Sequence, residues 1–171
     1  NNVLAEDRLF NLMCYVNDPI ISVINEYTYI IQVVENSRSR RIYDDFFNDS
    51  IASFIFFREY LIFNKKIDEY HDLLELSLVK DVIRMITYAY NYSESRISTL
   101  MKIVYSIKSD QLVTSMLKET ISKGALKKIF DSNLKSRYLA SQRHAINLLI
   151  FFQPLIFVIL FIFYQKMKSK L

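Results

Sequence analysis

The chain has 171 residues, of which 51% are hydrophobic, and it contains one glycine, two prolines and one cysteine. This length suits one modest domain, and the scarcity of glycine and proline argues against a turn-rich all-β fold. The lone Cys14 excludes an internal disulfide and a cysteine-based zinc site, and the net charge of +4 is mild.

The chain opens with a pattern that predicts one amphipathic helix over residues 6–16. Leu9 and Met13 belong to a set of apolar residues that recur at helical spacing. Glu6 and Asp7 fall in the first turn, where negative charge suits the helix dipole. A helix of this kind needs a partner surface for its apolar side.

Two short runs after this helix are rich in β-branched residues and predict strands. The turn at residues 17–19 ends the helix, and the runs cover residues 20–24 and 28–34. Residues 35–40, ENSRSR, form a polar loop. One helix and two strands cannot bury a core alone, so a larger sheet is expected before residue 1 or the later helices must cover them.

The middle of the chain is predicted to be helical. Apolar residues at steps of three and four indicate helices over residues 42–63, 68–90, 95–107 and 111–121. Ser109 or Asp110 is the expected N-cap of the last of these, and Gly124 is expected to end it as the C-cap. His71, beside Asp72, is interpreted as a surface residue.

Residues 123–144 are basic and precede an apolar tail. They contain six basic residues and one acidic residue. Because basic residues beside a membrane segment attract anionic lipid, membrane lipid is the expected partner, and no nucleic acid is expected. His144, at the border of the tail, is interpreted as a snorkelling residue.

Residues 145–165 predict a transmembrane helix. The segment 145–164 carries no charge, is about as long as a bilayer core requires, and contains Pro154, which should kink it. More positive charge lies upstream than downstream, which places the main domain on the cytoplasmic side of a single-pass protein. A buried core helix and a hairpin bent at Pro154 are the alternatives.

A family resemblance appears in the first forty residues. Residues 5–12, AEDRLFNL, resemble the acidic motif late in the catalytic domain of family-2 glycosyltransferases, which have a GT-A fold. Residues 24–32 resemble the strand pair that follows this motif, and residues 35–39 resemble the loop that closes it. The likeness is specific to about residues 3–39 and only general beyond them.

The resemblance implies a fold and a division of the chain. The fold is mainly α, with a short α/β remnant of a GT-A fold, a helical extension and one C-terminal transmembrane helix. The expected segments are residues 1–40 (end of the catalytic domain), 41–122 (helical extension), 123–144 (basic juxtamembrane stretch) and 145–165 (membrane helix).

The resemblance also implies an activity and its residues. Asp7 would be the base that takes the proton from an acceptor hydroxyl, with Glu6 orienting it, in transfer from a nucleotide sugar to a glycan or lipid-linked acceptor. Asn11, Gln32, Arg38 and Arg40 would contact substrate. Without the family pattern, Glu6 and Asp7 are ordinary first-turn acids that stabilise the helix.

The chain departs from the family in two respects. Gln32 stands where arginine is usual, which puts phosphate contact from this loop in doubt. The Asp-x-Asp motif that holds the metal is absent, so no metal ligand and no cofactor are expected within this chain, although the full enzyme would use Mg or Mn. The chain is therefore expected to be a fragment, inactive by itself.

Two non-enzymatic alternatives remain open. Residues 96–100, RISTL, at the start of a predicted helix, resemble a short segment of poxviral Bcl-2-like apoptosis inhibitors, which hold a partner helix in an apolar groove. This alternative predicts seven or eight helices. The other alternative is a tail-anchored subunit of a membrane complex.

Overall fold

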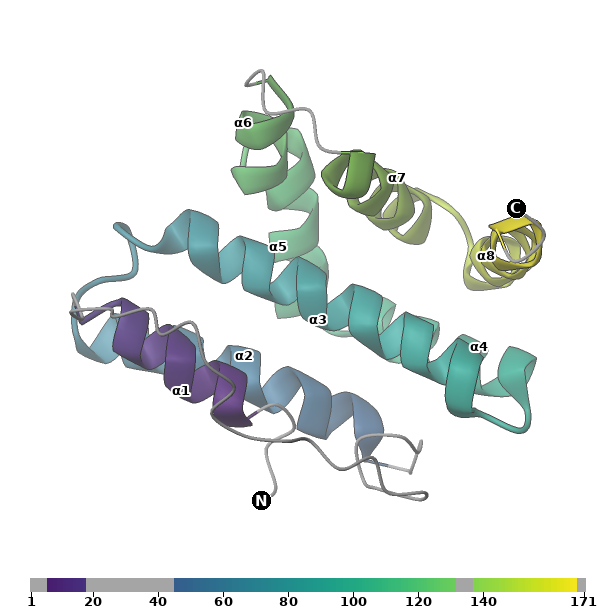
Figure 1. Ribbon diagram of the computed structural model, residues 1–171, viewed down its shortest axis with the longest axis horizontal. Coiled ribbons are helices and arrows are strands. Elements are labelled where there is room, and N and C mark those ends of the chain that lie inside the picture. Colours follow the sequence, from purple (N-terminus) through teal and green to yellow (C-terminus); the bar gives the residue numbers. More distant parts are fainter. Residues whose placement is uncertain (1–5, 18–44, 132–136, 169–171) are drawn as a thin grey trace, which may run out of the picture.

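The computed structural model describes residues 6–17, 45–131 and 137–168, and every element in these ranges is a helix. In chain order the helices are α1 (Glu6–Tyr15), α2 (Phe46–Phe63), α3 (His71–Tyr92), α4 (Arg96–Ser109), α5 (Gln111–Ser122), α6 (Ala125–Asp131), α7 (Arg137–Phe151) and α8 (Pro154–Lys168). Figure 1 shows them as a bundle assembled around α3.

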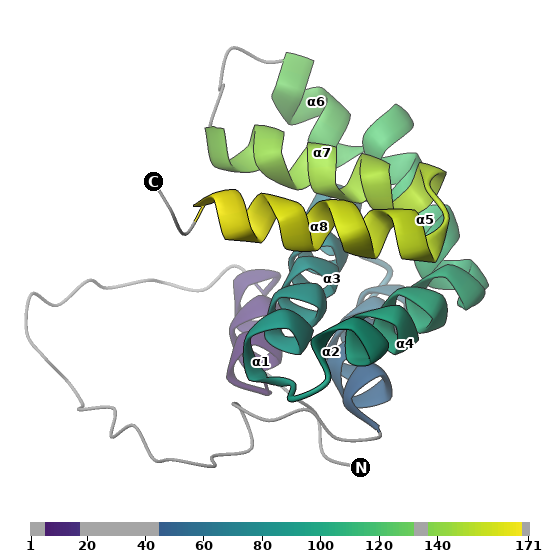
Figure 2. The ribbon, with the colours of Figure 1, turned by 90° about the vertical axis from the view of Figure 1, so that its right-hand side faces the viewer.

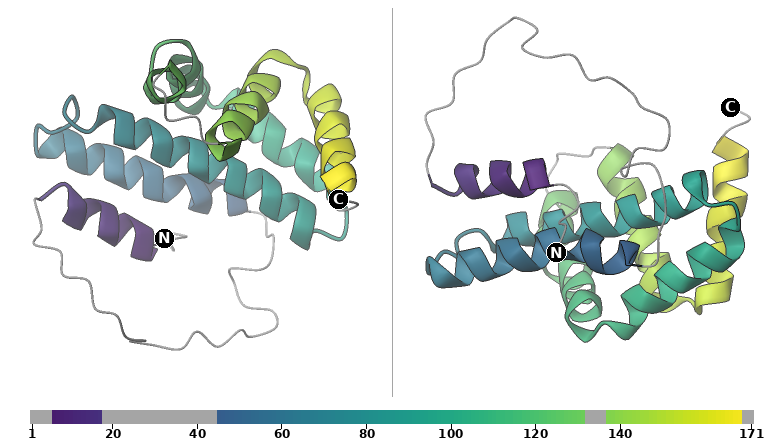
Figure 3. Two further views of the ribbon diagram at one scale, coloured as in Figure 1. Left: turned by 45° about the horizontal axis from the view of Figure 1, so that its top comes forward. Right: turned by 90° about the horizontal axis from the view of Figure 1, so that it is seen from below.

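The long helix α3 is the centre of the bundle because it packs against α2, α4, α5, α6 and α7. Its inward side carries Leu78, Val82 and Met85, each fully buried. Burial of such side chains is worth about 1.5–3 kcal/mol each. Figure 3 shows α1, α2 and α3 side by side in its left panel, with α2 between the other two.

Helix α1 packs on α2, and this contact contradicts the expected α/β remnant. Leu9, Leu12 and Met13 of α1 lie against the helical core. The apolar side of α1 is therefore partly covered by another helix and needs no sheet. The described residues contain no strand, and the two predicted strands, residues 20–24 and 28–34, lie outside them.

The expected transmembrane helix is also contradicted, because the apolar tail is divided between two helices. Helix α7 ends at Phe151 and α8 begins at Pro154, which has no backbone N–H to continue the earlier helix. Each helix has 15 residues, about 22 Å at the usual rise, whereas a bilayer core is about 30 Å thick. A kink at Pro154 within one membrane helix was predicted, whereas the structure has a break between two helices there.

Within the described residues, no helix combines the length and the apolar character that crossing a membrane requires. The predicted single-pass topology, with its main domain on the cytoplasmic side, is therefore wrong. Figure 2 shows α7 and α8 lying next to each other across one side of the bundle. Phe157 and Val158 of α8 are buried in the core, and Phe161 packs edge-on against Tyr90 at a centroid distance of 5.9 Å.

Candidate functional site

The residues predicted for sugar transfer are not brought together in the described part of the chain. Glu6 and Asp7 occupy the first turn of α1, as predicted, but their side chains lie outside the description. Asn11 is exposed on the same helix. Gln32, Arg38 and Arg40 lie outside the described residues, so their roles stay predictions.

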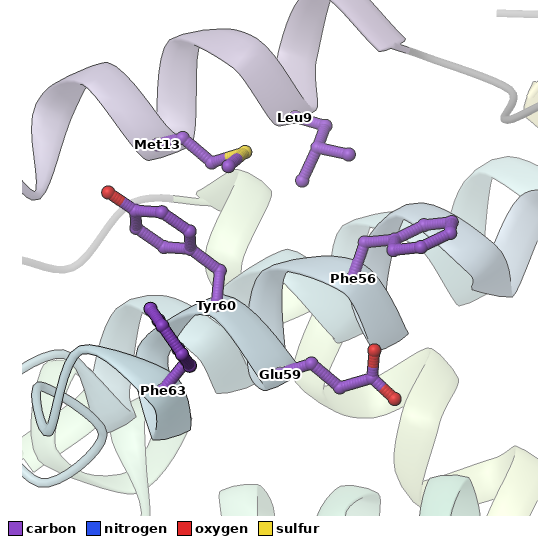
Figure 4. Close-up of a pocket in the computed structure, with 6 residues that line it drawn as sticks. All are labelled: Leu9, Met13, Phe56, Glu59, Tyr60 and Phe63. Atoms are coloured by element: carbon purple, nitrogen blue, oxygen red, sulfur yellow. The ribbon is translucent and has the colours of Figure 1, made fainter.

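A shallow apolar depression of about 380 Å³ lies between α1 and α2. Figure 4 shows Leu9 and Met13 on α1 facing Phe56 and Tyr60 on α2. Glu59 and Phe63 complete the lining, and Phe63 is 86% exposed. Exposed apolar residues that are scattered singly are common, whereas a contiguous exposed apolar surface often marks a site of contact with a partner.

Polar contacts hold the C-terminal end of α1 in place beside this depression. The Lys66 ammonium donates to the backbone carbonyl of Val16, just beyond the end of α1. The Asn17 side-chain amide donates to the Tyr60 hydroxyl at 2.5 Å. These bonds tie the end of α1 to α2 and the turn after it, so the two walls of the depression are positioned together.

Of the described side chains that line the depression, one is charged, namely Glu59, which is exposed. The remaining lining residues are apolar or aromatic, with the Tyr60 hydroxyl bonded to Asn17. Such a surface offers hydrophobic contact and one negative charge. It offers no pair of groups arranged for acid–base or nucleophilic chemistry.

Sequence inspection missed this depression for a physical reason. Apolar residues lie on almost every side of α2, and their spacing predicted a helix without distinguishing buried from exposed positions. Phe54 and Phe57 are indeed fully buried, whereas Phe56 and Phe63 are exposed. The spacing of Phe56, Tyr60 and Phe63, four and then three residues apart, was the available signal.

A second exposed apolar surface is the outer side of α8. Its exposed residues are Leu155, Ile156, Ile159, Leu160, Phe163, Tyr164 and Met167. Helices that are apolar on all sides are usually buried on all sides. Here one side lies on α4 and the end of α3, and the other side is open.

A polar cluster joins α3 to α5 and α6. Glu75 on α3 is fully buried, and its Oε2 accepts a hydrogen bond from the Ala125 backbone N–H at 2.6 Å, at the start of α6. His71 lies one turn earlier on α3, with Nδ1 3.8 Å from Glu75 Oε1. The interpretation of His71 as a surface residue is only partly right, because its ring is half-buried against this carboxylate.

A surface ion pair braces the same junction. Lys128 Nζ on α6 donates to Asp72 Oδ1 on α3 at 2.7 Å. This hydrogen bond raises the pKa of Lys128 above its ordinary value. Both side chains are well exposed, so the pair contributes little to the stability of the fold.

Comparison of the chain with protein-family models, with curated proteins and with solved structures finds no match.

Proposed function

We propose that the protein is a non-enzymatic helical binding protein that receives an amphipathic helix of a partner protein in the depression between α1 and α2. The observation that carries this proposal is the row of exposed and half-buried aromatic residues on α2, Phe56, Tyr60 and Phe63. This row of aromatic residues faces Leu9 and Met13 on α1. The residues of α1 and the row on α2 form the two sides of the depression, which is called the groove from here on.

The dimensions of the groove suit a helix. Phe56 and Phe63 are seven residues apart on one helix face, which corresponds to about 10 Å along the axis. A partner helix with apolar residues at positions i, i+3 or i+4, and i+7 presents a row of matching length. Met13 can adapt its shape to the side chain that it meets.

The charge of the groove selects the partner. Among the side chains that the structure describes, Glu59 is the only charged one that lines the groove. A lysine or arginine at the edge of the apolar row of the partner helix would meet this carboxylate. We therefore expect a basic amphipathic helix to bind more tightly than an acidic one of the same apolar pattern.

The all-helical architecture supports a binding protein over a transferase. Eight helices occupy the described part of the chain, and α4 begins at Arg96, the first residue of the RISTL segment that resembles Bcl-2-like proteins. Proteins of that kind bind a partner helix through an apolar groove. The transferase function, with Asp7 as its base, stays a prediction.

The test uses two synthetic peptides of about 20 residues, long enough to form a helix. They share leucines at i, i+4 and i+7 and differ only in carrying lysine or glutamate at the edge of this row. Fluorescence anisotropy with the full chain should show tighter binding of the lysine peptide. Glu59→Lys should reverse this preference.

Phe63→Ala should weaken binding of the lysine peptide about tenfold or more, as loss of an aromatic anchor residue of an interface does. Tyr105→Ala is the matched control, because Tyr105 is an exposed aromatic residue on α4, outside the groove. The proposal fails if neither peptide binds, or if Phe63→Ala leaves the affinity unchanged. It also fails if light scattering shows a dimer that Phe63→Ala dissociates, because a second copy would then cover the groove.

A second candidate function, contact with a lipid surface, is favoured by the outer side of α8. That side presents seven exposed apolar or aromatic residues. Tyr164 lies near its end, and Lys166, Lys168 and Lys170 follow in the sequence. Aromatic and basic residues at the end of an apolar surface are typical of helices that lie in the plane of a membrane interface.

This candidate is tested by co-sedimentation with vesicles of phosphatidylcholine, with and without phosphatidylserine. The full chain should bind the anionic vesicles, and replacing both Ile159 and Phe163 by serine should release it. Phe63→Ala serves as the control, because it leaves α8 unchanged. Binding that survives the double replacement would assign the lipid contact to another surface.

A further inference from the structure

We propose that His71, Glu75 and Glu119 form a binding site for a divalent metal ion of the zinc class. One ligand atom from each of these side chains lies within 4.8 Å of the other two. The site is separate from the groove of the proposed function, which lies between α1 and α2.

The fold places these three side chains together for simple reasons. His71 is the first residue of α3, and Glu75 follows four residues later, so both project from one face of the helix. Glu119 is on α5, which packs against α3. A metal ion held here would link two helices that are far apart in the sequence.

Glu75 is the feature that points to a cation. It is fully buried, and its Oε2 accepts the backbone N–H of Ala125. Its Oε1 has no hydrogen-bond partner among the described residues and lies 3.8 Å from His71 Nδ1. An unpaired carboxylate oxygen is costly in a protein interior, and a bound cation removes that cost.

The ligand set favours zinc. Imidazole nitrogen and carboxylate oxygen bind Zn²⁺ at about 2.0–2.2 Å, and two such ligands around a tetrahedral ion lie about 3.4 Å apart. A small rotation of His71 would shorten its 3.8 Å separation from Glu75 to this value. Mg²⁺ is less suitable because it prefers six oxygen ligands and retains its water.

Lys123 would compete with the metal ion for the carboxylate of Glu119. Its Nζ lies 3.1 Å from Glu119 Oε1, and both side chains are on the surface, with Glu119 37% exposed. An exposed pair of this kind is weak, so a metal ion can displace the lysine. Lys123→Met should therefore tighten metal binding.

The test is a titration of the full, tag-free chain with Zn²⁺ after treatment with a chelator. Calorimetry should show one equivalent bound, and Co²⁺ in place of Zn²⁺ should give the visible absorption of a site with nitrogen and oxygen ligands. Thermal unfolding should move to higher temperature with added Zn²⁺, because the ion binds the folded chain.

Two variants decide the assignment without removing the buried residue. His71→Ala and Glu119→Gln change partly exposed side chains, so the fold should survive, and circular dichroism checks this. Each should weaken Zn²⁺ binding about tenfold or more, as loss of a partner at a metal site typically does. His144→Ala is the control, because His144 is exposed on α7.

The alternative is that Glu75 only caps α6 and binds no ion. Absence of Zn²⁺ binding by the unmutated chain would establish that alternative and overturn the proposal. Binding that His71→Ala leaves unchanged would overturn it equally, because the ion would then occupy another place.

Discussion

The Lys108 ammonium on α4 donates a hydrogen bond to the backbone carbonyl of Phe152, just beyond α7, at 2.9 Å. The same Nζ donates to the carbonyls of Leu149 and Ile150 at 3.0 Å. The last carbonyls of a helix have no partner within it, and a cation is the favourable group at this end. Lys108 therefore supports the end of α7 where the apolar tail turns toward α8.

Lys108→Met should lower the free energy of unfolding by about 1.5–3 kcal/mol, the usual value for hydrogen bonds that involve a charged group. The methionine keeps the apolar stem and removes the donors. Urea denaturation measures the change. Lys102→Met, at an exposed position of the same helix, should change the free energy little, and an equal loss in both variants would contradict the specific role of Lys108.

The contribution of Lys108 should also depend on pH. Burial first, and then the charge of Lys118, lower the pKa of Lys108 below its ordinary value, so together they disfavour the charged form more than the three carbonyls favour it. A lysine in the unfolded chain has a pKa of about 10.4. At pH values between the lowered pKa and this value, the unfolded chain binds more protons than the folded chain, so the free energy of unfolding rises with pH. The difference in unfolding free energy between the wild type and Lys108→Met should therefore increase from neutral pH toward pH values above about 10.4. A difference that falls over this range would contradict the lowered pKa.

Gly124→Ala should destabilise the protein through Glu75. A Cβ atom at position 124 would lie 2.3 Å from Glu75 Oε2. The carboxylate would therefore have to move away and lose the hydrogen bond that it accepts from the Ala125 N–H. The expected loss is about 1–3 kcal/mol, the range for a buried polar group that loses its partner. Denaturation of the single variants and of Gly124→Ala with Glu75→Ala measures it.

The double variant is the control for this mechanism. Once Glu75 is shortened, the alanine at position 124 meets no carboxylate, so the two losses should not add. Strict additivity would show that the glycine matters for another reason. The glycine has no positive φ, and no described glycine has one, so backbone strain is not that reason.

Asp110→Ala should cost about 1 kcal/mol, because Asp110 is the N-cap of α5 and its Oδ1 accepts the Val113 N–H at 3.0 Å. Ser95, which precedes α4, makes no side-chain cap hydrogen bond. Ser95→Ala should therefore change the free energy of unfolding by only a few tenths of a kcal/mol. Thermal denaturation of both variants tests the difference, and equal losses would contradict the capping role.

Local features of the fold could be predicted from the sequence where one residue type dominates the outcome. Asp110 was predicted as one of two possible caps, and the structure confirms it. Pro154 was predicted to kink one helix, whereas it begins a second helix in the structure. The end of α5 near Gly124 was also predicted. Gly124 was predicted as the C-cap, whereas Lys123 is the C-cap and Gly124, which has no positive φ, follows it and donates its N–H to the Glu119 carbonyl. The close approach of Glu75, 49 positions away in the sequence, was not predicted.

Tertiary contacts could not be predicted from these patterns. The charge-free segment 145–164 is long enough for a membrane helix. Its sequence does not show that Lys108 binds the Phe152 carbonyl or that Tyr90 packs against Phe161 in the bundle. Likewise, Phe54 and Phe56 have identical side chains two positions apart on α2, and only the packing of neighbouring helices buries one and exposes the other. The groove and the His71–Glu75 cluster both arise from contacts of this kind.

The packing of α8 on the bundle can be tested with two residues of that helix. Phe157 is 2% exposed and lies in the core, whereas Ile159, two positions later, is 57% exposed. Phe157→Ala should lower the free energy of unfolding by about 3–5 kcal/mol, because it leaves a cavity. Ile159→Ala should change it by less than about 0.5 kcal/mol. If chemical denaturation shows small effects for both variants, α8 does not pack on the bundle in solution, and the division of the apolar tail into two core-facing helices is wrong.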